Sequence, residues 1–302
     1  MIKDFTDKNI SMQTGRTFLV TGANTGLGFE TAKVLAAKGG RVLLGCRSRD
    51  RAEAAMDEIL VETPDADLAF VPLDQANLTS VKEAAEIVKQ ELRLDVLINN
   101  AGIMGPPRTL TEDGFESQFG VNHLGTFALT SLLLPKLEKT KKSRVVITSS
   151  LAHKAGRINF NDVHADNGYI AFQRYAMSKF ANILHATELD RRLRSKNSHI
   201  RAICCHPGVA STELARHLPK VAQMFMPVAS LFLNTPAKGA WPTLAAAVGK
   251  GAVGGGYYGP SGFGEWMGTA SDAVRSRQSQ NPKLAEKLWD LSIELTGVDP
   301  GI

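Results

Sequence analysis

The chain has few of the features that mark membrane-spanning, secreted or zinc-stabilised proteins. No uninterrupted apolar run reaches the roughly 18 to 20 residues that cross a bilayer. The first 16 residues have no apolar core of the kind that a secretory signal contains. There are only three cysteines, an odd number, and their spacing matches neither a disulfide framework nor a zinc site. We therefore expect a cytoplasmic protein without stable membrane insertion.

Neither positive nor negative residues are in large excess. The 35 Lys and Arg against 30 Asp and Glu give a net charge of +5 and a pI near 9.1. Such a balance can suit a phosphate-rich ligand, an anionic membrane surface or a nucleic acid. However, the basic residues are scattered among the acids, which favours a solvated surface over a binding patch. We expect no nucleic-acid partner, and the sequence leaves the oligomeric state open, a homo-oligomer included.

Short β-branched runs alternate with amphipathic segments over most of the chain. This alternation predicts an α/β fold with a doubly wound, Rossmann-type parallel sheet of about seven strands and helices on both faces. No repeat or linker divides it, so we expect one domain, residues 1–302, with a flexible N-terminus at 1–15. The predicted strands are 17–21, 41–46, 68–72, 96–99, 144–148 and 200–205, with a last one in 249–264. The predicted helices are 27–38, 51–62 after Asp50, 81–92 after Ser80, 115–137, 169–194 and 282–295.

A glycine-rich turn follows the first predicted strand and leads directly into a helix. It runs Thr21-Gly22-Ala23-Asn24-Thr25-Gly26-Leu27-Gly28. Glycine permits positive φ and a close approach to a pyrophosphate, and the helix N-terminus supplies free N–H groups. A turn without a ligand is the alternative, but the order of strand, turn and helix favours dinucleotide binding.

Several motifs in the same order resemble those of the single-domain short-chain dehydrogenases. They are the glycine turn, Asn99-Asn100-Ala101-Gly102, Asn122, Ser150, Tyr175-x-x-x-Lys179 and Pro207-Gly208. The resemblance spans about residues 17–213. It implies a nucleotide site at the carboxyl ends of the strands and an oxidoreductase activity.

The end of the second predicted strand indicates which nucleotide is bound. An NAD site usually has Asp or Glu there, which accepts hydrogen bonds from the ribose. Here Cys46 and Arg47 follow Gly45, and a guanidinium suits a 2′-phosphate, so we expect NADP. A plain surface charge is the alternative for Arg47. By resemblance Asp74 contacts the adenine, although it could also be an ordinary turn residue.

Tyr175 and Lys179 lie four residues apart on a predicted helix and so share one face. Hydride transfer to a carbonyl needs a proton donor at the oxygen, and the reverse reaction needs a base. A tyrosine is a poor base at neutral pH unless a nearby ammonium favours its phenolate. By resemblance Tyr175 is the acid and base and Lys179 also holds the nicotinamide ribose. Ser150 then holds the substrate oxygen, and Asn122 orders water near the lysine.

The segment after the sixth predicted strand resembles the one that binds the nicotinamide carboxamide. It comprises Pro207, Gly208 and Val209, with Thr212 as a further contact, whereas His206 is expected to be structural. The full set of expected nucleotide-binding residues is Gly22, Asn24, Thr25, Gly26, Leu27, Gly28, Arg47, Asp74, Gln75, Asn99, Ala101, Gly102, Tyr175, Lys179, Pro207, Gly208, Val209 and Thr212.

The interval between Ser150 and Tyr175 is about twice the family's commonest one, because an extra loop occupies residues 156–168. With Ala152-His153 and Leu288-Trp289-Asp290-Leu291-Ser292, this loop resembles the retinol-dehydrogenase-like subgroup, which takes apolar alcohols and aldehydes. Residues 209–236 are expected to form a substrate lid. Their apolar part, Leu218 to Leu233, could instead be a membrane-touching helix or a plain packing helix.

These features together predict an NADP-dependent enzyme that interconverts a small apolar alcohol and its carbonyl compound. Two other functions use related folds: a non-catalytic NADP-binding sensor or scaffold, and a sugar-nucleotide epimerase or dehydratase. The presence of Tyr175, Lys179 and Ser150 argues against the sensor, and the glycine spacing argues against the epimerase.

Overall fold

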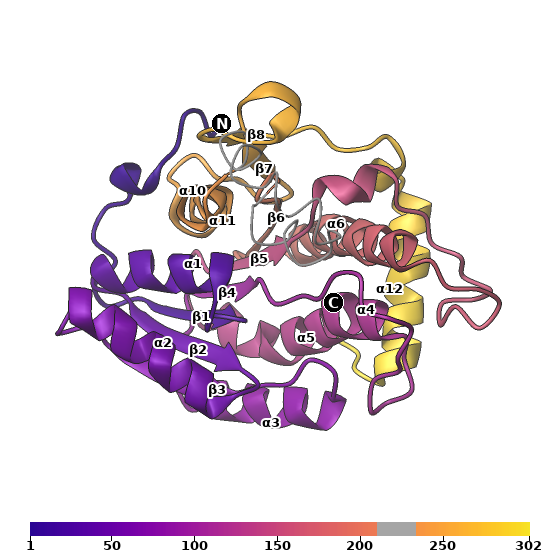
Figure 1. The fold of residues 1–302 in the computed structure, drawn as a ribbon, viewed down its shortest axis with the longest axis horizontal. Coiled ribbons are helices and arrows are strands. Elements are labelled where there is room, and N and C mark those ends of the chain that lie inside the picture. The colour runs from indigo at the N-terminus through magenta and orange to yellow at the C-terminus, as the bar shows by residue number, and fades with distance from the viewer. Residues whose placement is uncertain (210–233) are drawn as a thin grey trace, which may run out of the picture.

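The computed structural model describes residues 1–209 and 234–302 (Figure 1). In that part of the chain eight strands form one sheet in the order β3-β2-β1-β4-β5-β6-β7-β8. All neighbouring pairs are parallel except β7 and β8. The strands are β1 Thr17–Thr21, β2 Arg41–Cys46, β3 Leu68–Pro72, β4 Val96–Asn99, β5 Arg144–Thr148, β6 Arg201–Cys205, β7 Tyr257–Pro260 and β8 Ala270–Asp272. The predicted doubly wound fold is confirmed, with one antiparallel edge strand more than expected.

Helices cover both faces of this sheet. The α-helices are α1 Gly26–Ala37, α2 Arg49–Glu62, α3 Leu78–Lys89, α4 Ser117–Phe119, α5 Gly125–Glu138, α6 Ala171–Ser195, α10 Pro236–Gly239, α11 Trp241–Val248 and α12 Pro282–Thr296. Shorter helical turns are η1 Asp7–Asn9, η2 Gly120–Leu124, η3 Leu151–Lys154, η5 Phe263–Glu265 and η6 Gln278–Gln280.

Two hydrophobic clusters separate along the strands, as the two-residue period of a strand requires. Leu19 joins the cluster under α3, α5, α6 and α12, whereas Phe18 and Val20 join the one under α1, α2 and α11. Because both faces are covered, the central strands β1, β4 and β5 are almost wholly buried and read as continuous apolar runs. In such a sheet a ligand site is expected at the loops that follow the strands.

The first 15 residues are packed, which corrects the prediction of a flexible N-terminus. The backbones of Phe5 and Ala270 exchange two hydrogen bonds of 2.9 Å. Ile2, Phe5 and Ile10 are buried among the residues of the second cluster. Three isolated apolar side chains gave no periodic pattern, so the sequence did not reveal this docking.

Helix starts also differ from the prediction. Helix α2 is capped by Ser48 and α3 by Asn77, whose side-chain oxygens accept backbone N–H groups of the first turn. Ser80 instead accepts the Asp74 N–H. The helix predicted at 115–137 is divided into α4, the π-helical turn η2 and α5. Such a turn often marks a functional position.

Four histidines are buried in the core: His123, His153, His185 and His206. Burial lowers the pKa of His123 to about 3 and that of His153 to about 4, and it also lowers the pKa values of the other two. These imidazoles are therefore neutral in the folded protein at neutral pH. His123 contacts the Ser292 hydroxyl at 2.8 Å.

We predict that acid destabilises the fold through these histidines. Their ordinary pKa is near 6.5, so protons bind the unfolded chain preferentially once the pH falls below that value. Each fully neutral histidine then lowers the free energy of unfolding by roughly 1.4 kcal/mol between neutral pH and pH 5.5. Denaturant unfolding at pH 7.5 and 5.5 should show a smaller loss for His123→Gln than for wild type. The exposed control His199→Gln should keep the wild-type loss, and equal losses in all three proteins would contradict the prediction.

Candidate active site

The glycine turn between β1 and α1 is closely packed at Gly28, where no side chain fits. Gly22 and Gly26 have φ of +66° and +58°, which glycine adopts without strain. A Cβ at Gly28 would lie 2.2 Å from the Gly22 carbonyl oxygen and 2.5 Å from the Asn100 Nδ2. Asn100 in turn donates from Nδ2 to the Thr21 carbonyl at 3.0 Å. The turn is therefore held in one shape, with the N-terminus of α1 facing outward.

A cleft of about 920 Å³ runs along the carboxyl ends of β1, β2, β3 and β4. Most of the predicted nucleotide-binding residues line it. They are Gly22, Asn24, Thr25, Gly26, Leu27, Arg47, Asp74, Gln75, Ala101 and Gly102. The cleft, its backbone N–H groups and its positive helix end fit a dinucleotide with a pyrophosphate.

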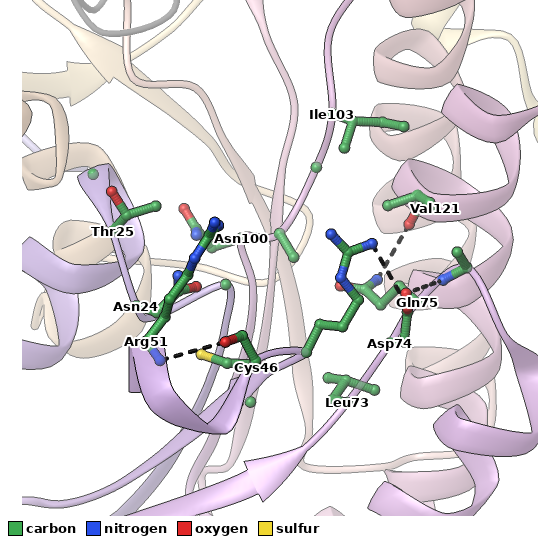
Figure 2. A pocket seen from close by; sticks show the side chains of 18 of the residues that line it. Asn24, Thr25, Cys46, Arg51, Leu73, Asp74, Gln75, Asn100, Ile103 and Val121 are labelled. Atoms are coloured by element: carbon green, nitrogen blue, oxygen red, sulfur yellow. Dashed lines mark hydrogen bonds and ion pairs between the residues drawn. The ribbon is translucent and has the colours of Figure 1, made fainter. Parts of the chain in front are cut away.

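Two arginines lie at the end of the cleft beside β2. The Arg47 side chain is 75% exposed, and its Nη1 lies 3.7 Å from Asp74 Oδ2. Such an exposed pair is weak, so the guanidinium can also meet an incoming anion. Arg51 lines the same cleft, and in Figure 2 its side chain extends beside Asn24 toward the glycine turn. Sequence reasoning missed Arg51, since only the folding of α2 turns it inward.

Asn99, the last residue of β4, and Asn100, which follows it, make different contacts. The Asn99 side chain is buried and donates to the Thr130 hydroxyl on α5, and Asn99 lines neither the cleft nor the smaller pocket described below. Asn100, which was missed as a site residue, lines the cleft and braces the glycine turn. The double asparagine of the motif was the signal that could have identified it.

Tyr175 and Lys179 lie one turn apart on α6, and both line a smaller pocket of about 330 Å³ next to the cleft. Only 3% of Tyr175 and 5% of Lys179 are exposed. The Lys179 Nζ lies 5.7 Å from the centre of the Tyr175 ring and donates to the Thr148 carbonyl at 3.3 Å. The predicted pair therefore shares a buried, water-poor setting where an ammonium acts strongly on a phenol.

The two serines after β5 make different contacts. Ser149 is buried, and its hydroxyl donates to the Lys179 carbonyl at 2.7 Å, which fixes α6 to the strand end. Ser150 is half-buried, and its Oγ accepts the Ala152 N–H at the start of η3. Ser149, rather than Ser150, is among the residues that line the smaller pocket. A Ser150 Oγ that accepts this bond still has its own hydrogen to donate.

Asn122 lies in the π-helical turn η2 and is fully buried. Its Oδ1 accepts the Ile103 N–H at 2.7 Å, and its Nδ2 donates to the Ile103 carbonyl and to the Ser178 hydroxyl. A Cβ at Gly102 would lie 3.1 Å from Asn122 Oδ1 and 3.2 Å from Lys179 Nζ. Gly102 therefore lies close to both side chains, and their predicted cooperation stays a prediction.

The wall of the smaller pocket away from the lysine is apolar. It is formed by Leu27, Ile103, Met104, Pro106 and Pro207. Because such a wall offers few polar partners, it favours a substrate whose body is hydrocarbon.

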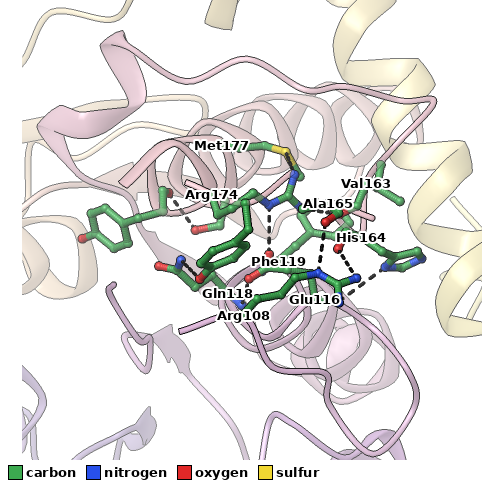
Figure 3. Close-up of polar contacts among 12 residues, drawn as sticks. Arg108, Glu116, Gln118, Phe119, Val163, His164, Ala165, Arg174 and Met177 are labelled. Carbon is green, nitrogen blue, oxygen red and sulfur yellow. Dashed lines mark hydrogen bonds and ion pairs between the residues drawn. The ribbon is translucent and has the colours of Figure 1, made fainter. Parts of the chain in front are cut away.

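The inserted loop at 156–168 is anchored by a buried ion pair (Figure 3). The Arg174 Nε lies 3.2 Å from Glu116 Oε2, and Arg174 also donates to the Val163 carbonyl. Glu116 is fully buried, and its carboxylate accepts the Gln118 and Phe119 N–H groups. Arg108 binds the loop from the other side through the Ala165 carbonyl. The loop is thus attached to the residue directly before Tyr175.

The turn after β6 is closely packed at Gly208. Gly208 has φ of +79°, and a Cβ there would lie 2.3 Å from the Trp266 carbonyl oxygen. Pro207 lines the smaller pocket, whereas Gly208 and Val209 are not among the lining residues of either pocket. Thr212 and Leu218 to Leu233 lie outside the described residues, as does most of the predicted lid at 209–236.

Comparison with known proteins agrees with this geometry. The family model described as short chain dehydrogenase matches residues 16–222. Retinol dehydrogenase 14 of Mus musculus is 42% identical over 298 residues, which cover 94% of this chain and 86% of that protein. A crystal structure of a protein from Mycobacterium paratuberculosis has a TM-score of 0.81 and 37% identity, and covers 99% of this chain and 100% of its own.

A short chain dehydrogenase from Shigella flexneri, solved in complex with NADP, has a TM-score of 0.64 and 25% identity. That match covers 82% of this chain and 97% of the other. The chain belongs to the short chain dehydrogenase family. It is an oxidoreductase, and its cofactor is a nicotinamide dinucleotide. Among residues 1–209 and 234–302, no helix is both long and apolar enough to cross a bilayer.

We predict that Gly28→Ala impairs nucleotide binding far more than it impairs folding. The added methyl group would meet the Gly22 carbonyl and push the turn away from α1. The dissociation constant for NADPH, measured by fluorescence, should rise at least about tenfold, the equivalent of losing one strong contact. Gly297→Ala is the control, because Gly297 ends α12 with φ of +64° and nothing within 4 Å of an added Cβ. It should lose stability and keep its affinity; unchanged affinity in Gly28→Ala would refute the close-contact argument.

Proposed function

We propose that the protein interconverts an apolar alcohol and its aldehyde or ketone with NADP(H), using Tyr175 as the proton donor and acceptor. The observation that carries this proposal is the buried Tyr175 and Lys179 pair in an apolar pocket that adjoins the dinucleotide cleft. Leu27, Asn100, Gly102 and Ile103 line both spaces, so a nicotinamide and a substrate carbon can meet there.

Two features support NADP over NAD. The end of β2 has Cys46 and Arg47 in place of the carboxylate that accepts bonds from an NAD ribose. Arg47 and Arg51 both line that part of the cleft, and a guanidinium can bind a phosphate with two hydrogen bonds. The NADP bound to the Shigella flexneri relative adds weight to this assignment.

Bound NADPH supplies hydride to the carbonyl carbon of the substrate. Tyr175 then gives its phenolic proton to the substrate oxygen, and the Lys179 ammonium stabilises the resulting phenolate. The Ser150 hydroxyl donates to the same oxygen and holds it toward Tyr175. Asn122 keeps η2 and the Ile103 backbone in place beside the lysine. Alcohol oxidation runs through the same groups in reverse.

The apolar pocket wall and the names of relatives such as retinol dehydrogenase 14 support a hydrocarbon-rich substrate. We also propose that residues 1–302 form one domain, because a single sheet contains all the described strands. A cytoplasmic location stays a prediction from the sequence.

We predict that Tyr175→Phe lowers kcat by at least about a hundredfold, since one acid and base group contributes roughly 10² to 10⁴ in rate. NADPH oxidation at 340 nm against a panel of apolar aldehydes, ketones and quinones measures this loss. The NADPH dissociation constant should change little. Ser150→Ala should also lose activity, whereas Ser149→Ala should chiefly lose stability.

Tyr258→Phe is the matched control for the tyrosine variant, because its hydroxyl accepts the Val253 N–H at 2.9 Å and lines neither pocket. It should keep wild-type turnover. Equal turnover by wild type and Tyr175→Phe would overturn the mechanism. Nucleotide binding by a wild type that reduces no carbonyl in a broad panel would instead favour the non-catalytic sensor.

We further predict that Arg47→Ala raises the dissociation constant for NADPH about tenfold and leaves that for NADH unchanged, because a 2′-phosphate loses a charged hydrogen bond. Arg51→Ala should act in the same direction. Arg49→Ala is the control, since Arg49 pairs with Glu53 on the exposed face of α2. A constant ratio of the two affinities in Arg47→Ala would remove that residue from cofactor selection.

A further inference from the structure

The turn formed by Pro207, Gly208 and Val209 is held by the loop of residues 261–269, far away in the sequence. The Val209 N–H donates to the Trp266 carbonyl at 3.0 Å. Asn234 is buried, donates from Nδ2 to the Pro207 carbonyl, and accepts the Gly268 N–H at 3.3 Å. The turn is thus held by the Trp266 backbone and by the Asn234 side chain.

His206 connects that turn to the same loop. It is fully buried, and its Nδ1 accepts the Gly208 N–H at 3.2 Å. The neutral ring must therefore have its hydrogen on Nε2. Nε2 lies 3.3 Å from Glu265 Oε2, a close approach without good hydrogen-bond alignment. A Cβ at Gly259 would lie 2.0 Å from Nε2, so a glycine is needed for the ring to reach the carboxylate.

Glu265 turns inward from an exposed loop. Its side chain is 16% exposed, whereas the neighbouring Phe263 is 91% exposed. Its Oε1 accepts the Val274 N–H at 2.7 Å, and its φ of +62° is unusual for a residue with a side chain. Burial opposes its ionisation, but the contact with His206 and the Val274 N–H outweigh this and lower its pKa to about 2. Glu265 is therefore an anion against a neutral imidazole.

Glu265 also reaches the segment that follows Ser150. Lys154, at the end of η3, donates to Glu265 Oε2 at 3.3 Å. In the same η3, His153 contacts the Ser150 carbonyl through Nδ1 at 2.7 Å and accepts the Ser276 N–H on Nε2. The His153 and His206 rings both lie against the ring of Tyr257, at centroid distances of 5.5 and 5.2 Å. The Glu265 carboxylate thus contacts both the segment after Ser150, through Lys154, and the segment before the turn at 207–209, through His206.

We propose that Glu265 is a positioning residue for hydride transfer, which acts through His206 to hold the turn at 207–209 in place for the nicotinamide ring. This inference rests on the proposed function, because that function gives the turn its ligand. Glu265 itself lines neither the cleft nor the smaller pocket. The Glu265 backbone is strained, and its carboxylate points inward from a largely exposed loop. Strained residues of this kind persist only where surrounding contacts fix them, and they are frequent at functional sites.

The test separates the two halves of the nucleotide. Glu265→Leu should raise the dissociation constant for NADPH about tenfold and lower kcat, because the nicotinamide turn loses its anchor. The dissociation constant for 2′-phospho-ADP-ribose, which has no nicotinamide, should stay within about twofold, since its cleft is formed by β1 to β4. Glu265→Gln should lie between wild type and Glu265→Leu, because its one carbonyl oxygen can serve only one of the two N–H donors.

The matched control breaks a second histidine and glutamate pair at the opposite end of β6. His199 Nδ1 lies 3.4 Å from Glu138 Oε1, and Glu138→Leu should change neither affinity nor kcat. Equal weakening of NADPH and 2′-phospho-ADP-ribose by Glu265→Leu would show a general structural role and overturn the proposal. So would unchanged NADPH affinity and kcat in Glu265→Leu. Failure of the proposed function has a different signature, namely a wild type that reduces no carbonyl, whether or not it binds NADPH.

Discussion

Hydrogen bonds hold helix α6 against the end of β5, and the geometry of the candidate active site depends on two of them, both at Lys179. The Ser149 hydroxyl donates to the Lys179 carbonyl, and the Lys179 ammonium donates to the Thr148 carbonyl. The first bond fixes the position of the α6 backbone relative to the end of β5. The second directs the Lys179 side chain across that end. Tyr175 lies one turn earlier on the same face of α6 and so points into the same pocket. Both side chains therefore take their positions from the packing of α6 against the end of β5.

The cleft and the pocket differ in polarity, and this difference follows from their construction. Glycines, helix ends and arginines form the cleft, where backbone N–H groups face solvent. The pocket is bounded by Ile103, Met104 and Pro106, in a segment that Asn122 and Gln118 hold by hydrogen bonds to its backbone. Buried side-chain amides thus satisfy the polar groups of an apolar loop, which leaves only its hydrocarbon surface for a substrate.

The sequence was most informative where one local pattern determines one local structure. The glycine turn, the paired Tyr175 and Lys179, and the Gly297 cap of α12 follow from spacing and conformational preference alone. The prediction failed where structure depends on contacts between distant segments. Nothing near Phe5 indicates its pairing with Ala270, and nothing near Arg51 indicates that α2 would turn it into the cleft. The bond from the Ser149 hydroxyl to the Lys179 carbonyl likewise depends on α6 and was not predicted.

The buried pair of Glu116 and Arg174 fixes the position of the inserted loop more than it stabilises the fold. Removing two charges from water costs several kcal/mol per ion, and such pairs often contribute little net stability. Here each partner also makes other hydrogen bonds: Glu116 caps α4, and Arg174 donates to the Val163 carbonyl. If either were lost, the other would be a buried charge without its partner. The loop therefore has one favourable arrangement against α6, and since Arg174 directly precedes Tyr175, that arrangement also affects the position of the proposed acid and base.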